Sequence, residues 1–173
     1  MKEYAGAICG PSEMWTPPCE REKQVPFAIM SIKPVYADMI LSGIKEWELR
    51  RRTVKNLVGM DILIYATYPY CKIAGSMRFD GYIAGKPDFV LSIVDNDGDE
   101  QEYRRYRKYF WGVKTAYAGS IIRSSVRPVD GPTLDGIRDW LDDSQWKPPQ
   151  SWTFWRGTKG QRDFFFGETG GKK

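Results

Sequence analysis

The segment SIKPVYADMILSGIKEWELRRR, residues 31–52, decides the fold that this sequence predicts. Pro34 stands where the first helical residue is expected, because its ring presets φ and an N–H group at that position would have no helical acceptor. Apolar residues then recur at helical spacing: Tyr36, Met39, Ile40 and Ile44. Gly43 is placed where a left-handed residue often ends a helix. The segment therefore predicts the end of a strand followed by a short helix from Pro34 to Gly43.

A second strand is predicted after Gly43, because the spacing of apolar residues changes from helical to alternating. In residues 45–52, KEWELRRR, Trp47 and Leu49 fall on one face. The opposite face carries charged side chains: Glu46, Glu48, Arg50 and Arg52. We expect the apolar face to point inward.

Three consecutive arginines follow Leu49. In an extended strand Arg51 would point toward the core, where an unpaired charge is costly. We therefore expect the strand to end near Arg50 and to leave Arg51 and Arg52 free to contact a polyanion.

The same residues resemble a known family. The run from Gly43 to Arg50, GIKEWELR, fits the pattern G-x-K-x-x-E-x-R of the ASCH domains, which belong to the PUA-like superfamily together with the EVE and YTH domains. Further stretches look like landmarks of one ASCH subgroup: Ser31–Pro34, Asp61–Thr67 and Pro148–Trp152. The resemblance thus spans about residues 26–155.

This resemblance implies an α+β fold, a PUA-like small mixed β-barrel with two to three flanking helices. It also implies a cleft between the barrel and the helix of residues 34–43, lined by Lys45, Glu48 and Arg50. From spacing alone, these three residues fit equally a surface strand with cross-strand charge pairs. We divide the chain into an N-terminal arm (1–25), an ASCH/PUA-like domain (26–156) and a C-terminal tail (157–173), for which the sequence predicts no structure.

The remaining elements are predicted from periodicity and turn residues. Strands are expected at Val25–Lys33, Asp61–Thr67, Lys72–Ile83, Ala116–Pro128 and Ser151–Trp155, and helices at Asp99–Trp111 and Thr133–Leu141. Pro87–Val94 is consistent with a strand or a helix, and Asp97-Gly98 indicates a turn. Gly75 and Gly81 are expected to mark bulges or close backbone approaches.

Composition narrows the possible classes of protein. The chain has 173 residues, of which 42% are hydrophobic, so it can bury a core of its own. No apolar run approaches the ~20 residues that cross a bilayer, and the start of the chain lacks the apolar block of a signal peptide. Three cysteines without a C-x-x-C spacing predict neither a disulfide framework nor a zinc site. We expect a cytoplasmic protein, a monomer by default, without membrane contact.

The sequence contains no histidine. This excludes Ser-His-Asp and Cys-His nucleophiles, histidine acid–base catalysis and histidine-ligated metals. No metal site and no cofactor is predicted. Any chemistry must depend on Lys, Glu, Asp, Tyr, Ser, Thr or Cys side chains.

Positive charge is clustered, although the net charge is only +4, from 26 basic and 22 acidic residues. The first cluster is Arg50, Arg51, Arg52 and Lys55, and the second is Arg104, Arg105, Arg107 and Lys108; the third, at the end of the chain, is Lys159, Arg162, Lys172 and Lys173. Such patches suit RNA or a modified nucleic acid. The second cluster fits equally the solvated face of an amphipathic helix whose buried stripe is Tyr103, Tyr106 and Phe110.

Aromatic side chains complete the predicted ligand site. Tyr65, Tyr68 and Tyr70 lie in or after a strand that would border the cleft implied by the family, where a ring could stack on a base. The full predicted set for nucleic acid or another ligand is Lys33, Lys45, Glu48, Arg50, Arg51, Arg52, Tyr65, Tyr68 and Tyr70, with Arg104, Arg105, Arg107 and Lys108 as a secondary basic patch.

Two functions fit this set. The first, which the sequence favours, is a nucleic-acid binding module that recognises RNA or a modified nucleotide. The alternative is a hydrolase, either a ribonuclease or an amidohydrolase acting on a modified nucleoside. It would use Lys45 as base and Glu48 as proton shuttle. Relatives that deacylate a modified cytidine carry a nucleophilic Thr where this chain has Glu48, which argues against that reaction.

Overall fold

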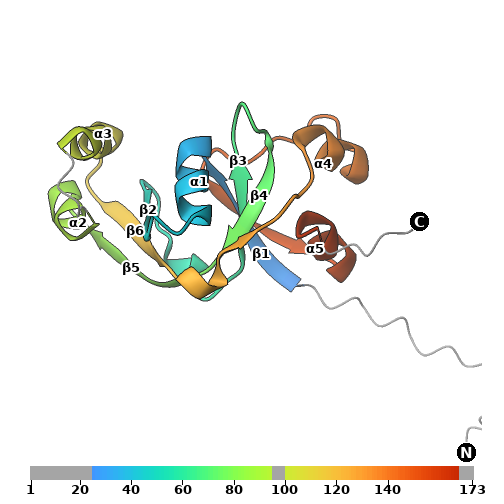
Figure 1. Cartoon of the computed structure of the whole chain (residues 1–173), viewed down its shortest axis with the longest axis horizontal. Coiled ribbons are helices and arrows are strands. Elements are labelled where there is room, and N and C mark those ends of the chain that lie inside the picture. Colours follow the sequence, from blue (N-terminus) through green and yellow to red (C-terminus); the bar gives the residue numbers. More distant parts are fainter. Residues whose placement is uncertain (1–24, 95–99, 168–173) are drawn as a thin grey trace, which may run out of the picture.

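Two β-sheets organise residues 25–94 and 100–167, the part of the chain that the computed structural model describes (Figure 1). The five-stranded sheet has the order β7-β4-β3-β1-β8, with bounds β1 Val25–Ile32, β3 Ile62–Ala66, β4 Lys72–Met77, β7 Arg127–Pro128 and β8 Trp152–Gly157. Only β1 and β3 are parallel among these pairs. The three-stranded sheet is antiparallel, in the order β2-β6-β5, with bounds β2 Trp47–Arg50, β5 Phe79–Gly85 and β6 Ala116–Ile121.

Five α-helices surround the sheets in the described part. They are α1 Pro34–Leu41, α2 Pro87–Val94, α3 Glu100–Tyr109, α4 Leu134–Leu141 and α5 Lys159–Phe165, with two short 3₁₀ turns, η1 Lys55–Leu57 and η2 Arg123–Ser125. The predicted mixed α+β class is confirmed. The strands form two hydrogen-bonded sheets, a closed barrel is not shown, and the helices outnumber the two or three expected.

Both long predicted strands are wrong as single strands, because each crosses from one sheet to the other. Lys72–Ile83 divides at Arg78 into β4 and β5, and Ala116–Pro128 divides at η2 into β6 and β7. Two hydrogen bonds join the crossing segments: the Arg78 N–H donates to Ser125 Oγ (2.8 Å) and the Ile122 N–H donates to the Arg78 carbonyl (2.9 Å). Alternation along one segment cannot show that its pairing partner changes.

The predicted bulges are confirmed. The register shifts in the β3–β4 pair beside Gly75 and in the β5–β6 pair between Phe79 and Gly81. Each extra residue bends its strand close to the place where the chain leaves one sheet for the other.

Three packed clusters form the core. The first lies between α1, through Ile40, and the inner face of the five-stranded sheet. The second lies on the opposite face of that sheet, where α4 and α5 pack through Ile137 and Phe165. The third joins α2 and α3 to the three-stranded sheet through Val90 and Phe110. The pairs α2–α3 and α4–α5 therefore lie at opposite ends of the molecule (Figure 1).

Local signals explain most of the helices. Pro34 is the first residue of α1, and Gly43 has a φ of +77°, as predicted. Thr133 caps α4 by accepting from the Gly136 N–H (3.2 Å), also as predicted. The ambiguous segment Pro87–Val94 is a helix. The stripe predicted for α3, with Tyr103, Tyr106 and Phe110, packs on the three-stranded sheet.

The sequence predicted nothing for α5, which begins with a capping box between Thr158 and Gln161 and buries Phe165 against β1 and β8. The proposed domain limits at 25 and 156 stay predictions. The N-terminal arm up to residue 24 and the Asp97-Gly98 turn lie outside the described residues. No helix in the described ranges has the length and apolar character needed to span a membrane.

We predict that Gly75→Ala destabilises the fold by about 1–3 kcal/mol, because an added methyl group overpacks the β4–β7 corner. The new Cβ would overlap Leu41 Cδ2 and lie 2.7 Å from the Arg127 carbonyl oxygen. Gly81→Ala is the matched control, since no atom lies within 4 Å of its Cβ, and it should change stability by less than about 0.5 kcal/mol. Urea unfolding of both variants measures the difference; equal losses would contradict the packing argument.

Candidate active site

The turn after α1 places Lys45 between two tyrosine rings. The backbone N–H groups of Ile44 and Lys45 both donate to the Met39 carbonyl (2.9 and 3.0 Å), so the chain folds back against α1. The Lys45 Nζ then lies 5.4 Å from the ring centroid of Tyr36 on α1 and 5.3 Å from that of Tyr106 on α3. Such cation–π contacts favour the charged amine.

Burial lowers the pKa of Lys45 below that of an ordinary lysine, and the nearby guanidinium of Arg50 lowers it further. The carboxylates of Glu48 and Glu102 act in the opposite direction, but they do not cancel the effect of burial. The Lys45 amine therefore loses its proton more readily than a solvent-exposed lysine does. A lysine with these properties can act as a proton acceptor.

Glu48 and Arg50 form a buried ion pair behind Lys45. The Glu48 Oε1 lies 2.8 Å from an Arg50 terminal nitrogen, and the two residues are only 5% and 6% exposed. The same guanidinium donates to the Ser31 carbonyl on β1 (2.9 Å). The charged face of β2 therefore points between the two sheets, and its interpretation as a solvated surface strand is wrong.

Two buried donors beside this pair have no acceptor among the described residues: Arg50 Nε and Trp152 Nε1. The Ser31 carbonyl accepts from a terminal nitrogen of Arg50, and the Ser31 N–H donates to the carbonyl of Ser151, the residue before Trp152. The Arg52 guanidinium covers the Trp152 ring at 5.4 Å.

The two rings that flank Lys45 belong to tyrosines with raised pKa values. Burial is the main cause for both, and the charge of Glu102 adds to it. The Tyr106 hydroxyl donates to Glu102, whereas the Tyr36 hydroxyl has no hydrogen-bond partner in the described ranges. Both hydroxyls therefore stay protonated near neutral pH, and that of Tyr36 is available to a ligand.

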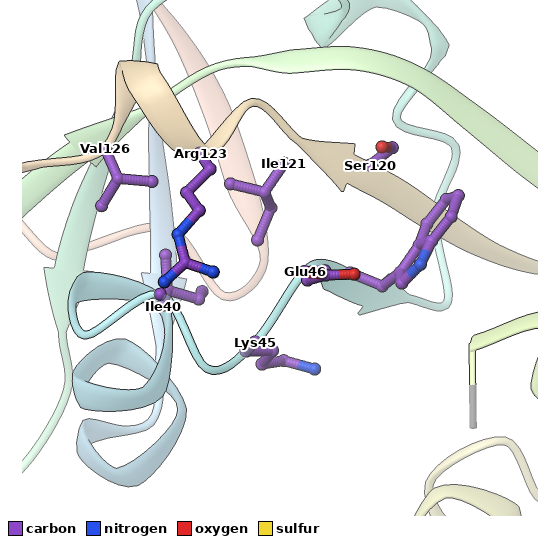
Figure 2. A pocket seen from close by; sticks show the side chains of 9 residues that line it. Ile40, Lys45, Glu46, Ser120, Ile121, Arg123 and Val126 are labelled. Carbon is purple, nitrogen blue, oxygen red and sulfur yellow. The ribbon is translucent and has the colours of Figure 1, made fainter. Parts of the chain in front are cut away.

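A pocket of about 260 Å³ opens beside Lys45 (Figure 2). It lies where the turn after α1 meets the end of β6, and Arg123 lies across from Lys45. Its walls are formed by Ile40, Gly43, Lys45, Glu46, Trp47, Ser120, Ile121, Arg123 and Val126. The pocket therefore offers basic groups and a serine hydroxyl next to the amine of Lys45.

The structure brings together Lys45, Glu48 and Arg50 but not the tyrosines predicted to join them. Tyr65 is buried in the cluster on the opposite face of the five-stranded sheet, where burial, followed by the effect of Cys71, raises its pKa to about 12. It lies on that face because alternate residues of β3 point to opposite sides.

Lys33, Tyr68 and Tyr70 lie near α1 rather than around Lys45. Lys33 is exposed at the residue that precedes α1. Tyr68 is 85% exposed in the loop after β3, and the Tyr70 hydroxyl donates to Asp38 on α1 (3.2 Å). These residues form a separate surface beside the helix.

The two basic clusters meet at the end of α3. β2 ends at Arg50, as predicted, and the Arg51 guanidinium donates to the carbonyl of Trp111 (3.4 Å). On α3 two of the four basic residues form exposed ion pairs, Arg104 with Glu100 and Arg107 with Asp88. The other two, Arg105 and Lys108, have no ion pair in the described part of the chain.

Sequence reasoning missed Tyr36, Tyr106 and Trp152 as parts of the site. Tyr36 and Tyr106 were assigned to packing stripes, and the helical periodicity of these stripes is real. Periodicity identifies the buried side of a helix. It does not show that Lys45 will lie between a tyrosine on α1 and a tyrosine on α3. Among the residues the structure describes, no group of three His, Cys, Asp or Glu side chains is arranged to hold a metal ion.

The structure defines a two-sheet α+β domain in which a half-buried lysine lies near a buried glutamate–arginine ion pair. No family model matches the sequence. The chain is 31% identical over 137 residues to an ASCH domain-containing ribonuclease of Zymomonas mobilis, which covers 78% of this chain and 88% of that protein. The chain therefore belongs to the ASCH domain family, as its motif predicted.

Solved structures agree with this assignment. The ASCH protein from Zymomonas mobilis superposes with a TM-score of 0.63 at 29% identity, covering 79% of this chain and 90% of that one. A serine-to-alanine variant of that protein gives a TM-score of 0.68 at 28% identity, covering 82% and 94%. A tyrosine-to-phenylalanine variant gives 0.65 at 29% identity, covering 78% and 94%.

We predict that Glu48→Leu destabilises the protein by about 3–5 kcal/mol, because it leaves Arg50 buried without its counter-charge. The double variant Glu48→Leu/Arg50→Leu should recover much of this loss, since both charges are then absent. Glu100→Leu removes an exposed i,i+4 pair and should cost less than about 1 kcal/mol. Urea unfolding midpoints test the set; a double variant as unstable as Glu48→Leu would contradict this explanation.

Proposed function

We propose that this protein is a ribonuclease that cleaves single-stranded RNA in the cleft beside Lys45. The similarity to a Zymomonas mobilis protein described as an ASCH domain-containing ribonuclease supports an RNA substrate. The observation that carries the proposal is the set of groups at the cleft. These groups are a lysine with a lowered pKa and, within the described residues, a tyrosine hydroxyl and two buried donors without a hydrogen-bond partner; together they could serve phosphodiester cleavage without histidine.

The proposed reaction is transfer of the phosphoryl group to the neighbouring ribose hydroxyl. The 2′-oxygen attacks phosphorus and its proton passes to the neutral Nζ of Lys45. The bond from phosphorus to the 5′-oxygen breaks, and that oxygen takes a proton from Tyr36. The products are a 2′,3′-cyclic phosphate and a 5′-hydroxyl end, so atoms and charges balance.

Arg50 stabilises the charge that develops on the non-bridging oxygens. Its Nε–H and the Nε1–H of Trp152 are fixed before substrate binds and make no other hydrogen bond in the described structure. Donors preorganised in this way, shielded from water, are the strongest source of transition-state stabilisation. Glu48 fixes the orientation of Arg50 through their 2.8 Å contact, so we assign it a positioning role instead of the proton-shuttle role considered from the sequence.

The exposed basic groups around the cleft bind the rest of the RNA. Arg51, Arg52, Arg105 and Lys108 lie on β2's end and on α3, next to the 84%-exposed ring of Trp111. Arginines that contact phosphates, together with an exposed ring that stacks on a base, form a typical surface for single strands. This arrangement retains the recognition part of the binding module that the sequence favoured.

Two other functions have weaker support. A binding module without catalysis would use the same surface, but the similarity to a ribonuclease favours cleavage. Deacylation of a modified nucleoside would need a nucleophilic hydroxyl at position 48, where the carboxylate of Glu48 is instead held by Arg50.

We predict that Lys45→Ala lowers cleavage of a labelled RNA oligonucleotide by about 10²–10⁴-fold, the usual contribution of a general base. Lys86→Ala, which removes an exposed lysine from the loop before α2, is the matched control and should retain wild-type activity. Mass spectrometry of the products should show the 2′,3′-cyclic phosphate, and an oligonucleotide with one 2′-deoxy sugar should resist cleavage at that site. Equal activity of Lys45→Ala and wild type would overturn the proposal.

The pH dependence of the reaction tests the role of Lys45 separately. Because the neutral amine is the active form, kcat/KM should rise as pH increases through the lowered pKa of Lys45, about tenfold per pH unit below that pKa. The raised pKa of Tyr36 keeps the acid protonated over the same range. Rates measured between about pH 5 and 9, with the Lys45→Ala background subtracted, check this. A rate that falls with rising pH would mean that the lysine acts as a fixed positive charge.

A further inference from the structure

A second pocket lies at the corner where both chain crossings pass between the sheets. Its volume is about 350 Å³, within the ~300–1,000 Å³ typical of small-molecule sites. Its walls are formed by Asp61, Ser76, Arg78, Ile122, Ser124, Ser125, Arg127, Pro128, Val129, Arg162 and Phe166. Residues from β4, β7, η2, α5 and the turns between elements thus contribute, and three of the side chains are arginines.

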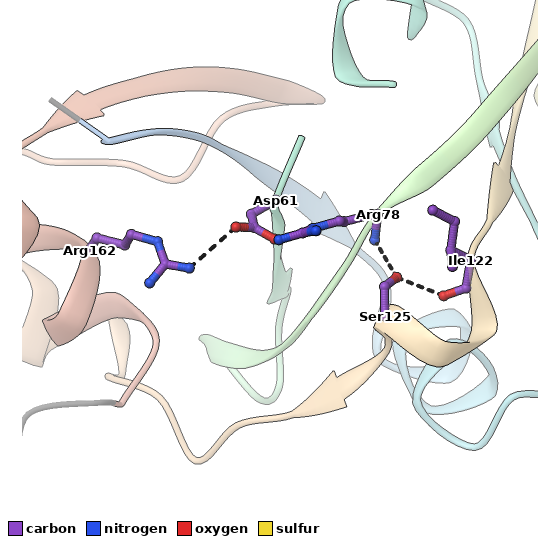
Figure 3. Close-up of polar contacts among 5 residues, drawn as sticks. All are labelled: Asp61, Arg78, Ile122, Ser125 and Arg162. Carbon is purple, nitrogen blue, oxygen red and sulfur yellow. Dashed lines mark hydrogen bonds and ion pairs between the residues drawn. The ribbon is translucent and has the colours of Figure 1, made fainter. Parts of the chain in front are cut away.

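Asp61 fixes two of these arginines. Its Oδ1 lies 2.6 Å from Arg78 Nε and its Oδ2 lies 3.2 Å from an Arg162 terminal nitrogen, so one carboxylate connects the β4–β5 corner to α5 (Figure 3). Burial by itself would raise the pKa of Asp61, but the hydrogen bonds from Arg78 and Arg162 lower it overall. The carboxylate therefore stays ionised and holds both guanidinium groups at the pocket.

The pocket contains donors that Asp61 does not use. Arg127 makes no ion pair and no side-chain hydrogen bond in the described ranges. The hydroxyls of Ser76, which is only 4% exposed, and of Ser124 have no hydrogen-bond partner there either. By contrast, Ser125 is occupied by the Arg78 N–H and the Ile122 carbonyl. A cation and two hydroxyls thus remain available beside the Asp61 network.

We propose that this pocket is a second phosphate-binding site, which holds a backbone phosphate of the RNA away from the bond that is cleaved. That the phosphate belongs to RNA rests on the proposed function, whereas the preference for a phosphate rests on the residues that line the pocket. Guanidinium groups match the geometry of phosphate oxygens, and serine hydroxyls add neutral donors. Because the arginines outnumber the single carboxylate among the lining residues, an anion is favoured.

The position of the pocket connects it to the cleft. The segment from Ile121 to Arg127 separates the two cavities: Ile121, Arg123 and Val126 line the pocket beside Lys45, and Ile122, Ser124, Ser125 and Arg127 line the second pocket. One RNA strand that crosses this short segment contacts both. Binding energy from the second site would then help to hold the strand in the cleft, so the benefit should appear in KM and only for RNA long enough to reach it.

The test uses the full chain and 2′-O-methyl RNA, which resists cleavage by this route. Fluorescence anisotropy should show that Arg127→Ala weakens binding of a twelve-nucleotide strand about 3–10-fold and lowers the salt slope by about 0.7, the value for one lost phosphate contact on a single strand. Binding of a trinucleotide should not change. Ser124→Ala alters no described hydrogen bond, and it should also weaken binding of the twelve-nucleotide strand.

Arg156→Ala is the matched control, because it removes an exposed arginine from β8 that has no partner in the described structure. If Arg127→Ala and Ser124→Ala behave like Arg156→Ala for both lengths of RNA, the second site does not exist. An equal loss of affinity for the trinucleotide and the twelve-nucleotide strand would also overturn the proposed second site. Thermal unfolding of each variant shows that the domain is intact.

The outcomes separate this inference from the proposed function. Wild-type protein that binds the longer strand in an Arg127-dependent way but never cleaves unmodified RNA would retain the phosphate site and reject the ribonuclease. Cleavage that depends on Lys45, with unchanged KM and kcat in Arg127→Ala on the longer RNA, would retain the ribonuclease and reject the site.

Discussion

The buried ion pair between Glu48 and Arg50 is the constraint on which the cleft depends. Two charges between the sheets are tolerated only because each has a partner, and Arg50 also donates to the Ser31 carbonyl across the gap. This network fixes β2 relative to β1 and thereby fixes the start of β2, where Lys45 leaves the turn after α1. The same two charges act on the lysine: Glu48 raises the pKa of Lys45 and Arg50 lowers it, while burial remains the largest effect.

The second constraint is the corner at which two segments of the chain, β4–β5 and β6–β7, cross from one sheet to the other. Two hydrogen bonds join the crossings, from the Arg78 N–H to Ser125 Oγ and from the Ile122 N–H to the Arg78 carbonyl, so the segment after β6 has a defined path. That segment forms one wall of each pocket. The crossing of the chain between the sheets thus contributes to both of these pockets. Concave sites at the junction of two sheets can be varied without altering the strands themselves.

The sequence predicted the positions of helices and strands better than it predicted which strands pair with one another. Pro34, Gly43 and Thr133 act locally, so α1 and the cap of α4 follow directly from residue chemistry. The exchange of strands between sheets depends on contacts distant in sequence, and no local pattern contains them. The motif likewise identified Lys45 with the buried Glu48–Arg50 pair, whereas Tyr106 joins them only because α3 packs against the three-stranded sheet. α5 was missed because three consecutive phenylalanines have no helical period, although its capping box was present in the sequence.

Because the sequence contains no histidine, the proposed reaction requires another side chain as its base. An exposed lysine is a poor base near neutral pH, because its pKa is about 10.4. Burial between Tyr36 and Tyr106 lowers the pKa of Lys45 because it disfavours the charged amine. The two rings and Glu48 act in the opposite direction, because they favour the charged amine. The two effects oppose each other, and burial is the larger, so the pKa of Lys45 stays below that of an exposed lysine. Lys45 also borders the pocket of about 260 Å³, so a cavity lies beside the lysine whose pKa burial lowers.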